Sequence, residues 1–320
     1  MTESPQKLLV TGGAGFIGSH LSNALLAEGH QVVILDDLSS GFSGNVPPSA
    51  QFVQASVTDA AAVAAAATDC DAIFHLAALV SVPECISDWT GGHRVNIGGT
   101  INVMQASRMQ GNIPVIYASS AAVYGDQTKD LCHEDDRPAP LSPYGADKLA
   151  CEHHASAFWH VHGLPSMGLR FFNVYGPGQS ITSPYAGVIA RFCENARSGQ
   201  PHAIFGDGLQ TRDFVHVSDV VAILIRSLDL LFLQPQALVS NVCSNSATSL
   251  LDLTAELGRI IPGSDRDIRF LPARKGDIRL SRGDDARMKR LFGHNRTLPL
   301  SQGLATLFAT LPHQGARNPA

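Results

Sequence analysis

The sequence predicts an α/β fold in which a doubly wound parallel sheet of the Rossmann type is joined to a smaller mixed α/β lobe. Three observations predict this fold. Short apolar runs alternate with segments of helical spacing in the first half of the chain, a glycine-rich turn at 12–18 separates the first run from the first helix, and Asp36 ends the second run. Strands that alternate with helices form parallel sheets with right-handed crossovers.

The predicted elements follow in a regular order. Apolar runs predict strands at Lys7–Val10, Gln31–Leu35, Gln51–Gln54, Ala72–Leu76, Val115–Ala118 and Ser166–Phe171. Helical spacing, and in one case an alanine tract, predicts helices at Phe16–Glu28, Ala60–Ala67, Val95–Met109 and Pro143–His162. After Asn173 the pieces are short and rich in turn residues. We therefore expect a cofactor-binding domain at 1–172 and a mainly substrate-binding lobe at 173–320, with the chain able to cross between them.

Composition narrows the class of partner. The chain has 320 residues, 44% of them hydrophobic, and a formal net charge of -5, so it can bury a core but carries no basic footprint for nucleic acid. The longest apolar run, Val220–Leu233, contains Arg226 and Asp229, which argues against a membrane span. The short polar start, Met1–Lys7, lacks the features of a secretory signal. We expect a cytoplasmic protein with a small-molecule substrate.

The six cysteines are scattered and show no paired spacing typical of a zinc site or a redox motif. We therefore expect reduced thiols and no metal site. They are Cys70, Cys85, Cys132, Cys151, Cys193 and Cys243.

The glycine-rich turn predicts a dinucleotide cofactor. Gly12, Gly15 and Gly18 are spaced as GxxGxxG between a strand and a helix, where the backbone can approach a pyrophosphate and the helix N-terminus favours its charge. Asp36 follows at the end of the second strand, where a carboxylate binds both ribose hydroxyls and repels a 2′-phosphate. This pattern favours NAD over NADP. A glycine-rich turn with an ordinary loop aspartate is the alternative.

Two further segments are candidates for cofactor contact. Leu76, Ala77 and Ala78 end a strand at the carboxyl edge of the sheet, where small side chains let a dinucleotide pass closely. Asn96 opens the next predicted helix. A helix N-cap explains this asparagine as well as a cofactor contact does.

The segment from Tyr144 to Lys148 predicts a general base. The two residues are four apart on one helix, so the lysine ammonium can favour the phenolate that a base needs. An exposed aromatic–cation pair has the same spacing. The strand that ends at Ser119 and Ser120 presents hydroxyl groups at the same edge of the sheet, and this coincidence favours an active site.

With these motifs the sequence resembles the extended short-chain dehydrogenase/reductase family, in its NAD-dependent epimerase/dehydratase branch, over nearly the whole chain. The resemblance implies catalytic roles for Ser120, Tyr144 and Lys148 and a structural role for Tyr124. It implies NAD contacts from Gly12, Gly15, Phe16, Ile17, Gly18, Asp36, Ser56, Val57, Leu76, Ala77, Ala78, Asn96, Ser119, Tyr144 and Lys148. It implies contacts with a UDP-sugar from Ser81, Ser120, Asn173, Arg212, Arg274 and Ser281.

The residues after Ser120 indicate which reaction to expect. Dehydratases of this branch carry an Asp–Glu pair there and decarboxylases keep a glutamate, whereas this chain has Ala121 and Ala122. The resemblance therefore implies a 4-epimerase of UDP-hexoses that works through a transient 4-keto sugar. Another sugar-nucleotide oxidoreductase, either a 4-reductase or a decarboxylase, is the first alternative, and a non-catalytic NAD-binding regulator is the second.

Three positions bear on specificity and cofactor affinity. Ser281 stands where the family has a pocket-wall residue, and its small size implies room for a C2 N-acetyl group. Ser56 and Val80 depart from residues that relatives place against adenine and the cofactor phosphates, so NAD is expected to bind less tightly. The resemblance also implies a homodimer that pairs the helices predicted at 95–109 and 143–162.

Overall fold

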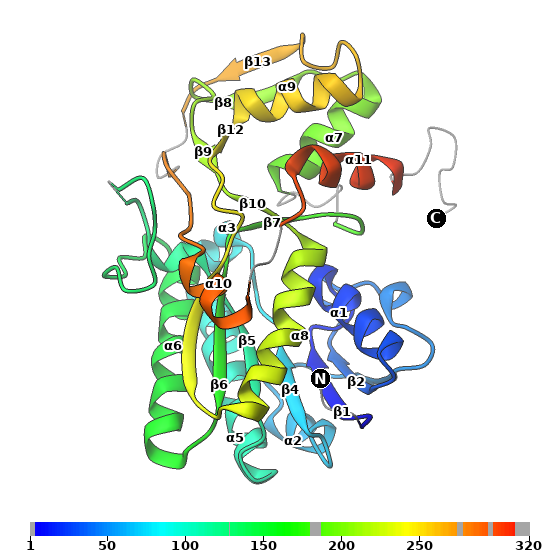
Figure 1. Ribbon diagram of the computed structural model, residues 1–320, viewed down its shortest axis with the longest axis vertical. Coiled ribbons are helices and arrows are strands. Elements are labelled where there is room, and N and C mark those ends of the chain that lie inside the picture. The colour runs from blue at the N-terminus through cyan, green and yellow to red at the C-terminus, as the bar shows by residue number, and fades with distance from the viewer. Residues whose placement is uncertain (1–3, 128, 180–186, 274–277, 294–296, 311–320) are drawn as a thin grey trace.

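The computed structural model describes residues 4–127, 129–179, 187–273, 278–293 and 297–310. Its main sheet has seven parallel strands in the order β11-β6-β5-β4-β1-β2-β3 (Figure 1). The strands are β1 (Lys7–Thr11), β2 (Gln31–Asp36), β3 (Gln51–Gln54), β4 (Ala72–His75), β5 (Val115–Ser120), β6 (Ser166–Phe171) and β11 (Ala237–Val242). The predicted doubly wound fold is confirmed. The strand order reverses between β1 and β4, which is where such sheets bind ligands.

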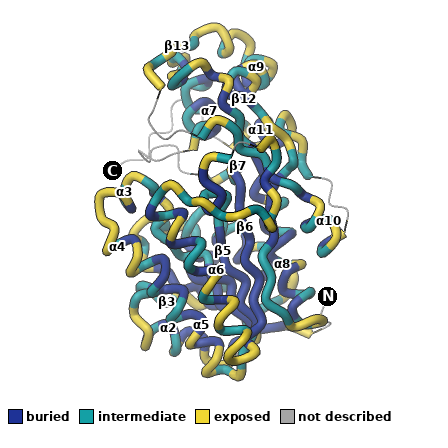
Figure 2. The backbone as a smooth tube through the Cα atoms, turned by 90° about the vertical axis from the view of Figure 1, so that its left-hand side faces the viewer, coloured by how far each residue is buried: buried dark blue, intermediate teal, exposed yellow. Residues whose placement is uncertain are grey.

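Helices cover both faces of this sheet and bury its apolar strands (Figure 2). On one face α1 (Phe16–Ala27) packs against α8 (Val217–Leu233). The other face carries α2 (Ala60–Ala66), α5 (Gly99–Met109) and α6 (Pro143–His162). Strands buried on two faces read as continuous apolar runs, which is why the sequence pattern located them.

The chain after residue 173 contributes to both parts of the molecule. Helix α8 and strand β11 return to the main sheet, where β11 pairs with β6 and α10 (Ala286–Phe292) packs on it. The rest forms an upper lobe around its own apolar cluster (Figure 1). Its helices are α7 (Val188–Ser198), α9 (Leu250–Ile260) and α11 (Leu300–Thr310). Its paired strands are β8 (His202–Phe205) with β13 (Ile268–Leu271), β9 (Thr211–Arg212) with β12 (Thr248–Ser249), and β7 (Asn173–Tyr175) with β10 (Phe214–His216).

The helix predicted at Val95–Met109 differs in its first part, which is π-helical and continues an earlier helical segment. The chain is already helical in α3 (Val82–Ser87) and α4 (Trp89–His93), and a π-helical segment, η2 (Arg94–Gly98), links α4 to α5. The wide π-helical turn ends at Gly99, which packs closely against Val57. A Cβ at Gly99 would lie 2.6 Å from Cγ2 of Val57. π-helical turns of this kind often lie at functional sites.

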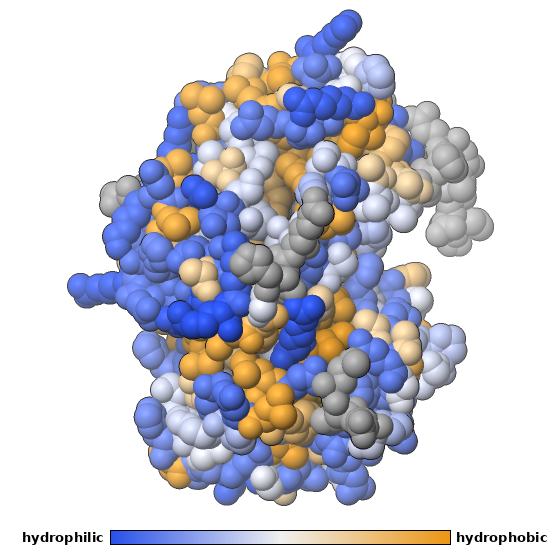
Figure 3. Space-filling view, viewed as in Figure 1, coloured by the Kyte–Doolittle hydropathy of each residue, from blue (hydrophilic) through white to orange (hydrophobic). Residues whose placement is uncertain are grey.

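The surface, the helices and the cysteines each give a further finding. Figure 3 shows a mixed face, with hydrophobic side chains gathered in its lower middle and at its upper end and hydrophilic ones along the left edge. None of the helices in the described part of the chain is long and apolar enough to cross a membrane. All six cysteines are buried thiols.

Candidate active site

The turn between β1 and α1 has the shape that a closely approaching dinucleotide needs. Gly12 has a φ of +72°, and a Cβ there would lie 2.6 Å from the backbone N of Ala77. A Cβ at Gly18 would collide with the carbonyl O of Gly12. Gly15 occupies the N-cap of α1, and no side chain of the described residues caps the helix. The uncapped N–H groups of its first turn, which includes Phe16 and Ile17, could bind a pyrophosphate.

The Asp36 carboxylate lies beside this turn and is only 7% exposed. Its Oδ2 accepts a hydrogen bond from the Ala14 N–H at 3.0 Å, and its Oδ1 accepts one from the Leu38 N–H at 2.8 Å. A carboxylate oxygen can accept more than one hydrogen bond, so both oxygens can still accept from ribose hydroxyls. The turn, the open helix N-terminus and this carboxylate therefore fit NAD.

The side chains of Ser56 and Val57 have partners within the protein. The Ser56 hydroxyl accepts hydrogen bonds from Thr58 N–H at 3.3 Å and Thr58 Oγ1 at 3.0 Å. Val57 is 4% exposed and belongs to the core cluster on the α5 side of the sheet. Contact between Val57 and a cofactor would therefore run through the backbone.

A buried histidine holds the end of β4 in place. The Thr100 hydroxyl donates to the Asn96 carbonyl O at 2.6 Å, so its oxygen accepts from His75 Nε2 at 3.1 Å. His75 Nδ1 then accepts from the Thr11 hydroxyl at 2.8 Å, and the Thr11 oxygen accepts from Ala77 N–H at 3.3 Å. Burial, and next the Lys148 ammonium, lower the pKa of His75 to about 3. This series of hydrogen bonds between uncharged groups positions the Leu76–Ala78 segment.

Asn96 does not cap a helix, so the N-cap alternative is wrong. It lies inside the π-helical segment, and its amide binds both backbone groups of Leu79: Oδ1 accepts from the N–H at 2.9 Å and Nδ2 donates to the carbonyl O at 3.2 Å. Nδ2 also donates to Asp147 Oδ2 at 3.4 Å. The side chain therefore ties the segment after β4 to α6.

Ser120, Tyr144 and Lys148 converge where β5 ends and α6 begins. The Ser120 oxygen accepts from Ala122 N–H at 3.1 Å, which leaves its proton for a ligand oxygen. Lys148 Nζ donates to the Ala118 carbonyl O at 2.9 Å and lies 5.8 Å from the centroid of the Tyr144 ring. Strand end and helix can meet because residue 145 is glycine; a Cβ there would lie 2.6 Å from the Ala122 carbonyl O.

Ser119, which we expected to contact the cofactor, has its side chain in the protein interior. It is 2% exposed, and its hydroxyl donates to Glu152 Oε1 at 2.5 Å. The Glu152 carboxylate also accepts two bonds from Arg170, from Nε at 2.9 Å and from Nη2 at 2.7 Å. Tyr124 lies in the same network and donates to Asn241 Oδ1 at 2.6 Å.

Sequence reasoning assigned no function to Glu152, Arg170 or Asp213. Two signals were available: Glu152 lies four residues after Lys148, and Arg170 interrupts an otherwise uncharged buried strand, which requires a partner. Asp213 accepts from Ser244 N–H and Oγ, each at 2.7 Å, and from Gly283 N–H at 3.1 Å. Burial raises the pKa of Asp213 to about 6.

Three of the six predicted substrate residues lie on adjacent segments of the upper lobe. Asn173 is exposed at the start of β7, and its N–H donates to the Asp213 carbonyl O at 2.9 Å. Arg212 Nη1 donates to the Ile278 carbonyl O at 2.7 Å, which places the 278–283 segment, with Ser281, alongside β9. Ser81 lies apart from them and caps α3 through Glu84 N–H at 3.2 Å. Arg274 lies outside the described residues.

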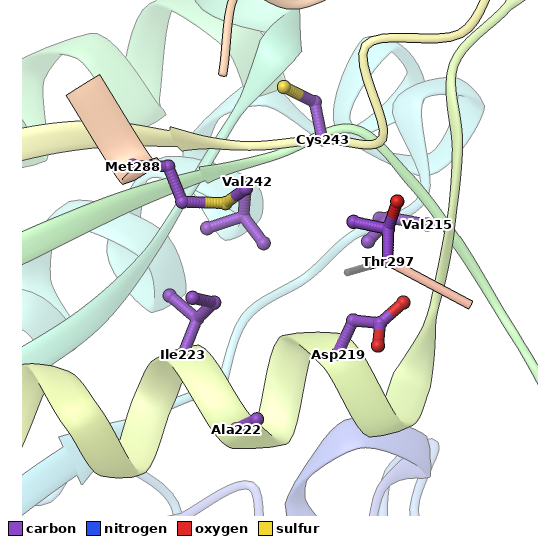
Figure 4. A pocket seen from close by; sticks show the side chains of 8 residues that line it. All are labelled: Val215, Asp219, Ala222, Ile223, Val242, Cys243, Met288 and Thr297. Atoms are coloured by element: carbon purple, nitrogen blue, oxygen red, sulfur yellow. The ribbon is translucent and has the colours of Figure 1, made fainter. Parts of the chain in front are cut away.

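A cavity of about 160 Å³ lies on the face of the main sheet that α8 covers, opposite the face that carries α6. It lies between α8, the end of β11 and α10 (Figure 4). Asp219 is its charged side chain, and its Oδ2 accepts from Leu298 N–H at 2.9 Å. None of the predicted site residues lines this cavity, so it is separate from the candidate active site. The described residues contain no cluster of His, Cys, Asp or Glu that could hold a metal ion.

Comparison with known proteins places this arrangement in a family. The chain is 38% identical over 309 residues to a UDP-glucose 4-epimerase of Mycolicibacterium smegmatis, covering 93% of this chain and 96% of that protein. It is 30% identical to a UDP-N-acetyl-alpha-D-glucosaminuronate decarboxylase of Bacillus cytotoxicus, covering 93% and 95%.

The structural and family comparisons agree with this result. The crystal structure of a UDP-glucose 4-epimerase with UDP-glucose from Thermotoga maritima superposes with a TM-score of 0.90 at 33% identity, covering 95% of this chain and 98% of that one. The model of the NAD dependent epimerase/dehydratase family matches residues 8–242. This chain, with NAD as its cofactor, belongs to the NAD-dependent epimerase/dehydratase family.

Proposed function

We propose that the chain is a 4-epimerase of UDP-hexoses. The observation that carries the proposal is the pair of alanines, Ala121 and Ala122, that follows Ser120 at the end of β5. An elimination or a decarboxylation at this place needs an acid or base beside the serine, whereas inversion at C4 needs only the base that first removes the hydroxyl proton. The Mycolicibacterium relative and the Thermotoga structure, both named as UDP-glucose 4-epimerases, support this choice.

In this mechanism Tyr144 removes the proton of the C4 hydroxyl and Ser120 donates a hydrogen bond to the same oxygen. Lys148 lies one helical turn from Tyr144 and stabilises its phenolate. The chemistry that NAD supplies when bound is reversible hydride acceptance from the sugar carbon. Tyr144 returns the proton once the sugar has presented its opposite face. The predicted NAD contacts listed above are part of this proposal, and because the Ser119 hydroxyl is bound to Glu152, we place its contact at the backbone.

We place the nucleotide-sugar diphosphate at Asn173, Arg212 and Arg274, and the C2 substituent at Ser281. The substitution Ser281→Tyr tests the last assignment, because a bulky wall excludes an N-acetyl group. We expect the variant to lose epimerisation of UDP-GlcNAc while it keeps that of UDP-glucose. Equal loss of both activities would contradict a role in selecting the C2 group.

The central test is incubation of the purified protein with UDP-glucose and UDP-GlcNAc without added reductant, with the sugars followed by NMR. We expect the 4-epimer to form with no net NADH. Tyr144→Phe should lower turnover by about 10²–10⁴-fold, the range of a general base. Tyr117→Phe removes a buried hydroxyl in the core of β5 and is the matched control. Near wild-type turnover of Tyr144→Phe would refute the mechanism.

Further assays, with a UDP-uronic acid or with a 4-keto sugar nucleotide and added NADH, address the alternatives. The Bacillus relative is named as a decarboxylase, so release of CO₂ from a UDP-uronic acid would favour that reaction. Net oxidation of NADH would indicate a 4-reductase. Binding of NAD with no change in any sugar would indicate a regulator.

We also propose that the chain acts in the cytoplasm as a homodimer with its interface on α5 and α6. Met109 on α5 is 65% exposed and Val161 on α6 is 71% exposed, so both helices carry apolar side chains that a partner could cover. Light scattering after gel filtration tests the dimer, and Met109→Glu should weaken it.

A further inference from the structure

The lysine of the candidate site has a buried carboxylate as its neighbour on the same helix. Lys148 and Glu152 are four residues apart on α6, a spacing that brings the Cβ atoms of two side chains to about 5–6 Å. Lys148 is 4% exposed and Glu152 is 7% exposed. Opposite charges attract more strongly in such an interior than at a surface, so these two residues would be expected to form an ion pair.

The structure pairs both residues differently. Lys148 Nζ donates to the Ala118 carbonyl O at 2.9 Å, which keeps the ammonium beside Tyr144. The carboxylate of Glu152 is bound by the guanidinium of Arg170 through two bonds, at 2.9 and 2.7 Å, and by the Ser119 hydroxyl. Consecutive residues of β5 thus hold two side chains of α6 in separate places.

Neighbouring strands fix the orientation of Arg170. In the register of the sheet, Arg170 of β6 lies opposite Ser119 of β5 on one side and Asn241 of β11 on the other. Its Nη1 donates to Tyr124 Oη at 2.9 Å, and its guanidinium carbon lies 4.8 Å from the centre of the Tyr124 ring. Burial opposes the charge of the guanidinium, but its bonds to Glu152 raise the pKa of Arg170, which stays charged.

The other ionisable groups around Lys148 do not replace Glu152 as a competing anion. Asp147 is bound by Asn96 and by His93 of α4, at 3.4 and 3.3 Å. Apart from Tyr144, burial keeps three nearby groups uncharged at neutral pH: it lowers the pKa of one imidazole to about 3 and raises the pKa of two thiols. These groups are His75 of β4, Cys85 of α3 and Cys151 of α6.

We propose that Arg170 is a positioning residue for Lys148: by binding Glu152 through two hydrogen bonds, it keeps this carboxylate from pairing with the lysine ammonium one helical turn away. The inference rests on the proposed function only for the statement that Lys148 binds NAD. Without Arg170, Glu152 has a buried charge, and Lys148 is a cation one helical turn away on α6. Lys148 would then leave Ala118 and the candidate site.

The first readout is the position of the ammonium. In a crystal structure of the Arg170→Gln variant, we expect Lys148 Nζ in ion-pair contact with Glu152. In Arg170→Gln/Glu152→Gln we expect it back on the Ala118 carbonyl O. A lysine that stays on Ala118 in the single variant would overturn the proposal, whatever reaction the enzyme catalyses.

The second readout is NAD affinity, measured by calorimetry. Loss of a hydrogen bond from a charged group weakens binding by about tenfold or more, so we expect this loss in Lys148→Met and in Arg170→Gln. Adding Glu152→Gln to Arg170→Gln should restore wild-type affinity, and Arg170→Gln should have no further effect in Lys148→Met. A loss that Glu152→Gln does not relieve would mean that Arg170 acts by its own charge or through the fold.

Two controls keep the experiment decisive. Glu152→Gln by itself removes the competitor and should keep both the Ala118 contact and NAD affinity. If Arg170→Gln does not fold, Arg170→Lys keeps a cation in the core but cannot form the two-bonded pair. We then expect a smaller loss of affinity that Glu152→Gln still relieves, and a loss unaffected by Glu152→Gln would overturn the proposal.

If Lys148→Met binds NAD normally, the cofactor role of Lys148 fails while the structural readout still decides the inference.

Discussion

Replacing Gly12 by alanine tests the cofactor turn at its closest approach to β4. The new Cβ would lie 2.6 Å from Ala77 N, 2.8 Å from Ala77 Cα and 2.9 Å from the Leu76 carbonyl C, and all three are backbone atoms. The left-handed backbone at Gly12 adds strain of about 1–2 kcal/mol, and overpacking adds about 1–3 kcal/mol. We therefore expect Gly12→Ala to lower the free energy of unfolding by about 2–5 kcal/mol.

Gly29→Ala is the matched control for this prediction. Gly29 also has a left-handed backbone, with a φ of +87°, but a Cβ there meets no described atom within 4 Å. Gly29→Ala should therefore lower the free energy of unfolding only by the backbone strain, about 1–2 kcal/mol. Urea denaturation of both variants without added NAD gives the two free energies, because a bound ligand would mask the difference.

The same pair of variants links stability to cofactor binding. Movement of Leu76 and Ala77 distorts the segment that we place against NAD, so we expect Gly12→Ala to weaken NAD binding by about tenfold or more, which is about 1.4 kcal/mol. Gly29→Ala should bind NAD normally. Equal losses of stability in the two variants would refute the argument that contact with β4, rather than backbone strain, makes glycine necessary at position 12.

Three further predictions concern single side chains. Because burial raises the pKa of Asp213 to about 6, the folded chain holds this proton more tightly than the unfolded chain, so stability should fall by about 3 kcal/mol between pH ~4 and pH ~6. Asp213→Asn should lose this slope in urea titrations, and an unchanged slope would contradict the assignment. NMR should show His75 neutral and protonated on Nε2 above pH ~5; titration in that range would contradict the lowered pKa, and a proton on Nδ1 would contradict the tautomer. Asp59→Ala removes the cap of α2 and should cost about 1 kcal/mol in thermal unfolding, whereas no change would mean that the cap contributes nothing.

Local sequence signals predicted much of the main sheet. Strand β3 and helix α6 have the predicted bounds, because apolar periodicity and turn residues are properties of a few adjacent positions. The π-helical segment was missed because its wide turn accompanies contacts with residues far away in the sequence, such as that between Gly99 and Val57. The return of β11 to the edge of the sheet was likewise invisible, since an edge position depends on which strand is already there.

The residues of the candidate site were likewise predicted only in part from the sequence. The residue types at Gly12, Asp36, Tyr144 and Lys148 were evident because their roles follow from spacing along one turn or one helix. The side chain of Ser119 was misplaced, because the orientation of one hydroxyl at a strand end depends on what packs against it. In this chain that group is Glu152.

The sequence by itself determined the alternation of strands and helices, the glycine turn and the residue types available for catalysis, since each depends on short-range geometry. Only the tertiary structure decided which partner each buried charge takes. Glu152 binds Arg170 rather than Lys148 because the sheet sets Arg170 beside Ser119 and Asn241. A buried charge must be paired, and several pairings satisfy the same sequence. The choice among them is made by the strands that bring distant residues into register.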